Sequence, residues 1–230
     1  MRSFLILALC ILLALPALAE KPRYESSAPS TRVPCGLASV VHDWDFAVSD
    51  HGFTTASCDD QGAFMWEHGA TSYIPDAPGN VWGTVLEGNY PVEGGEALVS
   101  PTFTVEATTY LFEIFHYYDA ENLWDGGNVK VNGQEVAPLV GYPGMISVPG
   151  DWYAWCVDFQ MGFTGVDSGW LTSCFDLSAF IGQEVSVTFE FGSDDAYVEA
   201  GWYIASMRVG SDQGVPTEQK SFSEIKGTFR

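Results

Sequence analysis

Two segments of the sequence combine aromatic side chains with acids, which are the residue types that hold sugar rings. The residues of interest in 117–127 (YYDAENLWDGG) and 151–156 (DWYAWC) are Tyr118, Trp124, Asp125, Trp152, Tyr153 and Trp155. Trp and Tyr have an apolar face and a polar edge, and a carboxylate accepts hydrogen bonds from hydroxyls. We therefore expect these residues to bind a ligand. A structural alternative stays open, in which Asp125 caps a tight turn and the second aromatic set plugs one end of the domain.

No catalytic motif accompanies these segments. Residues 165–169 (GVDSG) lack the G-x-S-x-G spacing of a nucleophile elbow, and nothing around Ser168 predicts the strand, turn and helix that would expose it. None of the 4 histidines lies in His-Glu-x-x-His, the zinc peptidase motif. Glycoside cleavage needs two carboxyls about 5–9.5 Å apart, which sequence spacing does not reveal. We expect a protein that is not an enzyme, and a glycan-active hydrolase is the remaining catalytic alternative.

The charge of the chain excludes one class of partner. Its 30 acidic and 9 basic residues give a formal net charge of −21. So negative a surface repels nucleic acid phosphates and anionic lipids. We expect no nucleic acid partner, whereas the carboxylates are compatible with calcium binding or with hydration in a salty medium.

Residues 1–19 (MRSFLILALCILLALPALA) have the parts of a signal peptide, with basic Arg2, an apolar run and a small-x-small end at Ala17 and Ala19. The apolar run, residues 4–15, is shorter than the roughly 20 residues of a membrane-spanning helix. A membrane anchor and a lipoprotein acylated at Cys10 are the alternatives. We expect a mature chain from Glu20, without a membrane span, that is secreted or held at the cell surface, with the periplasm as another possible location.

Removal of Cys10 with the signal peptide leaves an even number of cysteines, which in an exported chain predicts disulfides. Three pairings are open. We favour Cys35–Cys58 and Cys156–Cys174, because each pair is close in sequence and lies within one candidate hairpin region. No pair has the Cys-x-x-Cys spacing of a metal site.

Hydrophobic periodicity predicts strands. Residues 184–191 (EVSVTFEF) alternate between apolar and polar side chains, which indicates one buried and one solvated face. Residues 109–116 (TYLFEIFH) are apolar on both faces and predict a central strand covered on each side.

Further strand signals follow the same pattern. Residues 128–132 alternate and end at Asn132-Gly133, a pair typical of a tight hairpin turn. Residues 202–209 predict the final strand. About ten short strands without an amphipathic helix predict an all-β, antiparallel jelly-roll β-sandwich.

The sequence divides into a signal peptide (1–19), a flexible leader (20–35), one β-sandwich domain (36–210) and a C-terminal tail (211–230). In the tail, Ser221 and Glu224 form a possible capping box for a short helix. The tail also carries apolar and basic side chains, namely Phe222, Ile225, Phe229, Lys220, Lys226 and Arg230. The tail either packs on the domain or frays, or it docks to a surface or sorting partner.

A series of short motifs runs through residues 42–210. They are Trp44-Asp45-Phe46, His51-Gly52-Phe53, Trp82-Gly83-Thr84, Leu98-Val99-Ser100-Pro101, His116-Tyr117-Tyr118, Trp124-Asp125-Gly126-Gly127, Phe175-Asp176-Leu177-Ser178, Gly192-Ser193-Asp194-Asp195 and Gly201-Trp202-Tyr203-Ile204. Together they resemble the MAM-like jelly-roll modules, in particular the β-sandwich of immune inhibitor A-type secreted metallopeptidases. The resemblance implies a galactose-binding-like sandwich without chemistry of its own, used for adhesion, for carbohydrate or protein binding, or to support a neighbouring enzyme.

The same resemblance implies a calcium ion between the first and last strands. Acids expected there are replaced by Ala47 and by Ala205-Ser206, and a methyl group does not ligate a cation that prefers six to eight oxygens. The remaining alternative is a displaced calcium site built from Asp43, Asp45, Asp194 and Asp195.

The sequence as a whole predicts a secreted recognition module without catalytic activity. Its expected partner is an extracellular glycan or a surface protein. A structural or self-assembling surface protein without a small ligand is the alternative.

Overall fold

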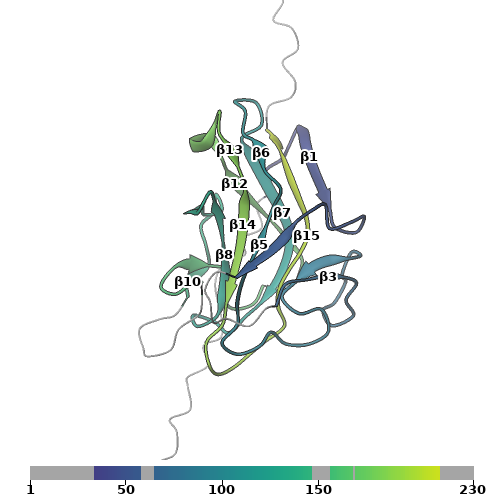
Figure 1. Ribbon diagram of the computed structural model, residues 1–230, viewed down its shortest axis with the longest axis vertical. Helices are drawn as coiled ribbons and strands as arrows, with labels where there is room; N and C mark the ends of the chain where they lie inside the picture. The colour runs from purple at the N-terminus through teal and green to yellow at the C-terminus, as the bar shows by residue number, and fades with distance from the viewer. Residues whose placement is uncertain (1–33, 58–64, 147–155, 168, 213–230) are drawn as a thin grey trace, which may run out of the picture.

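The computed structural model describes residues 34–57, 65–146, 156–167 and 169–212. Two antiparallel sheets enclose a common core, so the jelly-roll β-sandwich expected from the sequence is confirmed (Figure 1). The signal peptide, residues 20–33 of the leader, the tail from residue 213, Cys58, Ser168, Trp152, Tyr153 and Trp155 lie outside the described residues. Among the described residues, no helix has the length and apolar character needed to cross a membrane.

The two main sheets contain six and five strands. The six-stranded sheet consists of β1 (Ser39–Asp45), β3 (Glu67–Gly69), β4 (Val81–Gly83), β7 (Leu111–Asp119), β12 (Leu171–Asp176) and β15 (Gly201–Ser211). The five-stranded sheet consists of β2 (Thr54–Ser57), β5 (Gly95–Val99), β8 (Gly126–Val131), β9 (Gln134–Glu135) and β14 (Val187–Gly192). Two short pairs join β6 (Phe103–Thr104) to β13 (Glu184–Val185) and β10 (Gly144–Met145) to β11 (Met161–Gly162), and a 3-10 turn covers Ser178–Phe180.

Strand β15 holds the six-stranded sheet together. It pairs with β7 along nearly its whole length and with β1, so the first and last strands of the domain lie side by side (Figure 1). Strand β7 lies between β12 and β15, as its apolar sequence predicts. A register shift between Ile204 and Ser206 interrupts the β15–β7 ladder. Beyond it, Ser206 and Arg208 point away from the core, while Met207 is buried in it.

The core lies between the sheets and is built largely from aromatic rings. Trp202 of β15 is fully buried, and its ring centre lies 5.7 Å from that of Phe189 on the opposite sheet and 5.9 Å from that of Trp66. In β13 and β14, every second residue from Val185 to Phe191 is buried and Glu184 is exposed. The alternation read from residues 184–191 is therefore confirmed.

The predicted hairpin turn is also present. Asn132 and Gly133 connect β8 to β9, with φ values of 50° and 78°. Only residues that tolerate positive φ turn the chain this tightly, which explains the pair of residue types.

A second, smaller apolar cluster covers the outer face of the six-stranded sheet. Tyr117 and Tyr203, which point away from the main core, pack with Ile74 from the segment between β3 and β4. Trp170 donates its indole N–H to the carbonyl of Pro75 at 3.0 Å. This contact helps to hold that segment on the sheet.

The disulfide pairing favoured from the sequence is wrong. Cys35 is bonded to Cys174, which excludes both Cys35–Cys58 and Cys156–Cys174. The physical reason is strand pairing across long sequence distances. Cys174 of β12 lies opposite Glu113 of β7, and the Glu113 carboxylate accepts the backbone N–H of Cys35 at 3.0 Å. Cys156 is also in a disulfide.

Candidate functional site

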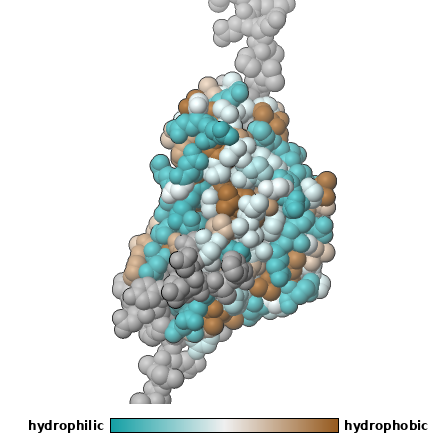
Figure 2. Space-filling view, viewed as in Figure 1, coloured by the Kyte–Doolittle hydropathy of each residue, from teal (hydrophilic) through white to brown (hydrophobic). Residues whose placement is uncertain are grey.

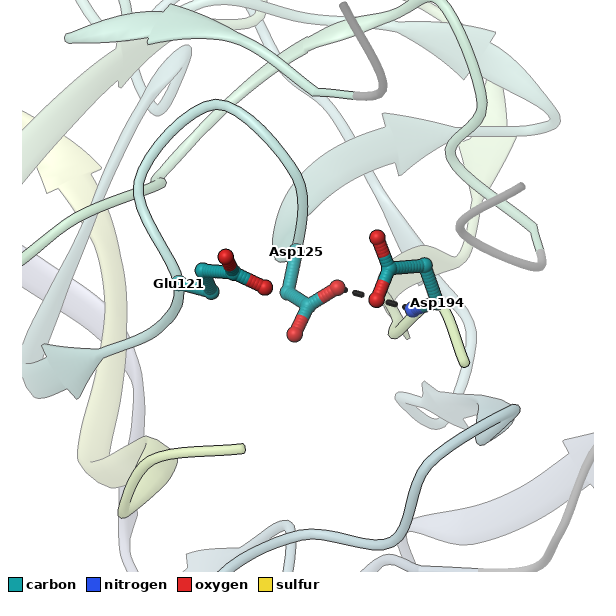
Figure 3. Close-up of side chains that lie close together, drawn as sticks. All are labelled: Glu121, Asp125 and Asp194. Atoms are coloured by element: carbon teal, nitrogen blue, oxygen red, sulfur yellow. Dashed lines mark hydrogen bonds between the residues drawn. The ribbon is translucent and has the colours of Figure 1, made fainter. Parts of the chain in front are cut away.

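Three buried carboxylates converge at one end of the sandwich. Glu121 and Asp125 come from the β7–β8 connection, and Asp194 follows β14. In the β8–β14 ladder, Gly126 lies opposite Gly192, so the residues just beyond these two strand ends meet. One ligand atom from each acid lies within 4.8 Å of the others (Figure 3). We call this group the acid cluster.

Hydrogen bonds fix Asp125 at the centre of the acid cluster. One carboxylate oxygen accepts the backbone N–H of Asp194 at 2.8 Å (Figure 3). The other accepts the Tyr90 hydroxyl at 2.8 Å. The Tyr90 oxygen in turn accepts the backbone N–H of Glu121 at 3.0 Å. Tyr90 thus bridges two members of the acid cluster.

Burial and like charges change the acidity of these groups. Burial is the main cause that raises the pKa of the Asp125 carboxyl well above its usual range, and the neighbouring Asp194 charge raises it further. Burial, followed by the Asp125 charge, likewise raises the pKa of Tyr90. The acid cluster therefore favours neutralisation of Asp125, either by a proton or by a nearby cation.

The donor set of the acid cluster is one that a hard divalent cation accepts. Calcium prefers six to eight oxygen ligands, and Glu121, Asp125 and Asp194 supply carboxylate oxygens from two chain segments. The exposed fractions of the three residues are 5%, 0% and 2%. A substrate does not reach groups so deeply buried, and their position suits a structural role.

The structure corrects the sugar-binding role expected for one aromatic segment. Tyr118 and Trp124 are only 4% and 6% exposed, and Asp125 is fully buried. Their faces pack inside the domain and leave no surface on which a sugar ring stacks. The other three predicted ligand-binding residues lie outside the described residues.

The four acids expected to build a displaced calcium site do not converge. In the part of the chain that the structure describes, Asp194 lies in the acid cluster, whereas Asp43 and Asp45 lie on β1 beside β15. Asp195 is exposed. Glu121 is the member that the sequence analysis missed. The sequence feature that could have indicated Glu121 is its position in the same loop as Asp125.

A groove of about 320 Å³ occupies the outer face of the six-stranded sheet next to β1 and β15. The residues that give it chemical character are Asp43, Asp45, Asn80, Phe115, Ser206 and Arg208. We call it the outer groove. Asp43 lies opposite Arg208 and Asp45 lies opposite Ser206 in the β1–β15 ladder. Strand pairing therefore fixes the positions of these four lining residues. No sequence motif marked Asn80, Phe115, Ser206 or Arg208 as part of a site.

The outer groove is where the family resemblance places calcium, and its residues do not fit that ion. Ala47 and Ala205 line it with methyl groups, as the sequence indicated. One carboxylate oxygen of Asp45 accepts the backbone N–H of Ala47 at 3.0 Å, which leaves it less available as a ligand. Arg208 is paired with Glu113 and supplies only N–H donors, so it adds no oxygen ligand for the ion.

Comparison with known proteins finds a relative that matches this chain over only part of its own length. No family model matches the sequence. The chain is 27% identical over 183 residues to Bacillopeptidase F of Bacillus subtilis, a match that covers 77% of this chain and 11% of that protein. The chain therefore spans about a tenth of the length of that relative. The coarse expectation of a peptidase-associated β-sandwich agrees with this match, while the MAM-like resemblance stays an expectation.

Solved structures with a similar arrangement include adhesin domains and an enzyme. The K1 cleaved adhesin domain of Lys-gingipain from Porphyromonas gingivalis has a TM-score of 0.42 and 11% identity, over 75% of this chain and 98% of that one. The K2 cleaved adhesin domain of Lys-gingipain has a TM-score of 0.39 and 14% identity, over 73% and 96%. An exo-beta-1,3-galactanase from Phanerochaete chrysosporium has a TM-score of 0.32 and 13% identity, over 69% of this chain and 29% of that one. Because these scores are low, the fold assignment rests on the strand pairing described above.

Proposed function

We propose that this chain is a secreted recognition module without catalytic activity, which binds a carbohydrate of an extracellular surface in the outer groove. The observation that carries the proposal is the outer groove itself. Its volume of about 320 Å³ is within the range of small-ligand sites, about 300–1,000 Å³. It brings hydrogen-bonding groups and an aromatic ring to the same place.

The chemistry of the outer groove suits a sugar. Asp43, Asp45 and Asn80 offer carboxylate and amide groups to ligand hydroxyls, and Phe115 offers an apolar ring. Phe115 is held by Trp170, whose ring centre lies 5.3 Å away. A ring held in this way keeps its orientation without a ligand, which lowers the entropy lost on binding.

Two further observations support export and the lack of catalysis. The N-terminal segment has signal peptide features, and the disulfide between Cys35 and Cys174 fits an oxidising compartment. The acid cluster is closed to substrates by its burial. The match to Bacillopeptidase F covers only 11% of that protein, which fits an accessory module of a larger peptidase, and its peptidase activity is not extended to this chain.

A glycan array tests the proposal. The mature chain, residues 20–230, is applied with calcium and again with a chelator, and one glycan class is expected to bind. Phe115→Ala should weaken that binding at least tenfold. Phe159→Ala, which removes an exposed aromatic ring outside the outer groove, is the matched control. Equal binding by both folded variants, or no binding by the folded wild type, would contradict the proposal.

A self-assembling surface protein is the second candidate, and one feature favours it. Met145 and Met161 lie opposite each other in the β10–β11 pair and are 43% and 39% exposed. On the face seen in Figure 2, however, hydrophobic side chains form separate spots in a mostly hydrophilic surface. Such scattered exposure is normal for a monomer. Light scattering that shows oligomers dissociated by Met161→Asp would favour this candidate.

A further inference from the structure

The acidic residues of the outer groove outnumber its bases. Asp43 and Asp45 lie two residues apart on β1, so both point to the same side of the sheet, with Cα atoms about 7 Å apart. Arg208 is the base that lines the outer groove among the described residues, and its guanidinium is paired with the buried carboxylate of Glu113. Asp43, Asp45 and the buried Glu113 together with Arg208 leave a local charge of −2.

The pairing of Arg208 determines which ligand charge the outer groove accepts. Glu113 is 3% exposed and also accepts the Cys35 N–H at 3.0 Å, so its carboxylate is held in place. A ligand anion would have to compete with Glu113 for Arg208. Separation of Arg208 from Glu113 is unfavourable because it leaves the buried Glu113 carboxylate without its ion pair. The outer groove is therefore poorly suited to an anionic ligand.

The carboxylates of Asp43 and Asp45 suit a positively charged group. In the described part of the chain, neither carboxylate forms an ion pair with a base at 4.0 Å or less. An ammonium group has three donors and forms charge-assisted hydrogen bonds with carboxylates, which are roughly twice as strong as neutral ones. Phe115 lines the same groove on the far side of Ser206 from Asp45, and an aromatic face attracts a cation.

The field of the whole protein acts in the same direction. A net charge of −21 attracts cationic ligands and repels glycans that carry carboxylate or sulfate groups. We propose that the outer groove selects glycans with free amino groups, such as de-N-acetylated hexosamine polymers, an inference that rests on the proposed function above. The ammonium lies between Asp43 and Asp45, and the apolar face of the sugar ring lies on Phe115.

Two oligosaccharides with the same backbone test this selectivity. A chitosan hexamer carries free amines, whereas a chitin hexamer carries N-acetyl groups in their place. Calorimetry at pH 6 and low salt is expected to show at least about tenfold tighter binding of the chitosan hexamer, since its ammonium groups form charge-assisted hydrogen bonds that the N-acetyl groups do not form. The double variant Asp43→Asn/Asp45→Asn should lose this preference and keep its thermal midpoint.

Controls separate local selectivity from general attraction. Glu106→Gln/Glu135→Gln removes the same number of charges from exposed positions outside the outer groove and should keep the preference. An equal loss in both double variants would overturn the proposal, as would hexalysine binding as tightly as the chitosan hexamer. Equal binding of the two hexamers would overturn the amino-sugar inference and leave the proposed function standing. Binding of no glycan at all would overturn both.

Discussion

At the scale of single residues, His116 shows how a reactive side chain serves the core. It is fully buried, and its Nδ1 accepts the indole N–H of Trp202 at 3.0 Å. Because Nδ1 is an acceptor, the neutral ring carries its proton on Nε2, which lies 2.9 Å from the Ser173 hydroxyl. Burial lowers the pKa of His116 to about 3. The imidazole is thus a neutral structural bridge at neutral pH.

The lowered pKa of His116 predicts a loss of stability in acid. His116 takes up a proton near pH 6.5 in the unfolded chain and only near pH 3 in the folded chain. The contribution of the neutral imidazole to the free energy of unfolding is therefore complete above pH 6.5 and is lost as the pH falls towards 3. From pH 7 to pH 5, this group should lower the free energy of unfolding by about 2 kcal/mol. Urea denaturation at both pH values measures the change, and a folded His116→Gln variant should show a smaller one. NMR titration that shows a charged His116 in the folded protein at pH 5 would contradict this prediction.

The raised pKa of Asp125 predicts that this group changes the free energy of unfolding with pH in the opposite direction to His116. Its pKa is raised in the folded state, so its proton favours folding at low pH, and this contribution is lost as the pH rises above about 4 through the folded pKa. In a chelating buffer, Asp125→Asn should therefore lose less stability than the wild type between pH 5 and pH 8.5. Added calcium should raise the thermal midpoint of the wild type more than that of this variant.

Asp195→Asn provides the matched control for this experiment. It removes one charge from the exposed neighbour of Asp194 and leaves the acid cluster intact. Its pH dependence and calcium response should follow those of the wild type. If Asp125→Asn also follows the wild type, the electrostatic account of the acid cluster is wrong.

The acid cluster also shows how much of the candidate site could be predicted from the sequence. Asp125 and Asp194 were both singled out, one as a ligand-binding residue and the other as a metal ligand. Their meeting depends on the β8–β14 register, which joins residues 69 positions apart through one hydrogen bond. Sequence spacing does not contain that register. For the same reason, the burial of Tyr118 and Trp124 could not be predicted from the sequence.

At the scale of elements, local patterns were sufficient to predict individual strands. The alternation in 184–191 and the Asn132-Gly133 turn depend on neighbours in sequence, and both are confirmed. The pairing of β1 with β15 joins the two ends of the domain and has no local signal. The disulfide prediction failed because it assumed local pairing.

The Cys35–Cys174 bond should contribute strongly to stability. It joins residues 139 positions apart, and closing a loop of this length corresponds to about 5 kcal/mol in the chain-entropy model. The double variant Cys35→Ser/Cys174→Ser is expected to lose much of this amount in urea denaturation. Peptide mapping without reduction should find the 35–174 linkage and, by elimination, link Cys156 to Cys58. Recovery of a Cys35–Cys58 peptide would contradict this pairing.

Gly127 of β8 lies in close contact with Trp202 of the opposite sheet. A Cβ atom there would lie 2.5 Å from a ring carbon of Trp202 and 2.6 Å from the carbonyl oxygen of Glu190. Gly127→Ala is therefore expected to lower the free energy of unfolding by about 1–3 kcal/mol through overpacking. Gly88→Ala is the control, because a Cβ there would meet only an ordinary contact at 3.8 Å. Equal stability of the two variants would show that the sheets separate without cost.

At the scale of the whole molecule, the charge balance is the dominant feature. The 30 acids exceed the 9 bases, and the ion pairs seen among the described residues are Lys130–Glu190 and Arg208–Glu113. Pairing thus leaves a large excess of negative charge on the folded protein. Self-repulsion of this kind destabilises the compact state, while the net charge favours solubility.

This self-repulsion predicts that salt stabilises the fold at neutral pH. Raising NaCl from 10 to 150 mM shortens the screening length from about 30 Å to about 8 Å, so distant carboxylates repel each other less. The thermal midpoint in a chelating buffer at pH 7 should rise, and each kcal/mol of stabilisation corresponds to about 2–4 °C for a chain of this size. Near pH 4.1, where the sequence is close to zero net charge, the same salt step should have little effect. An equal rise at both pH values would mean that salt acts through hydration and not through charge, and the attraction of amino sugars to this protein would then depend on Asp43 and Asp45 alone.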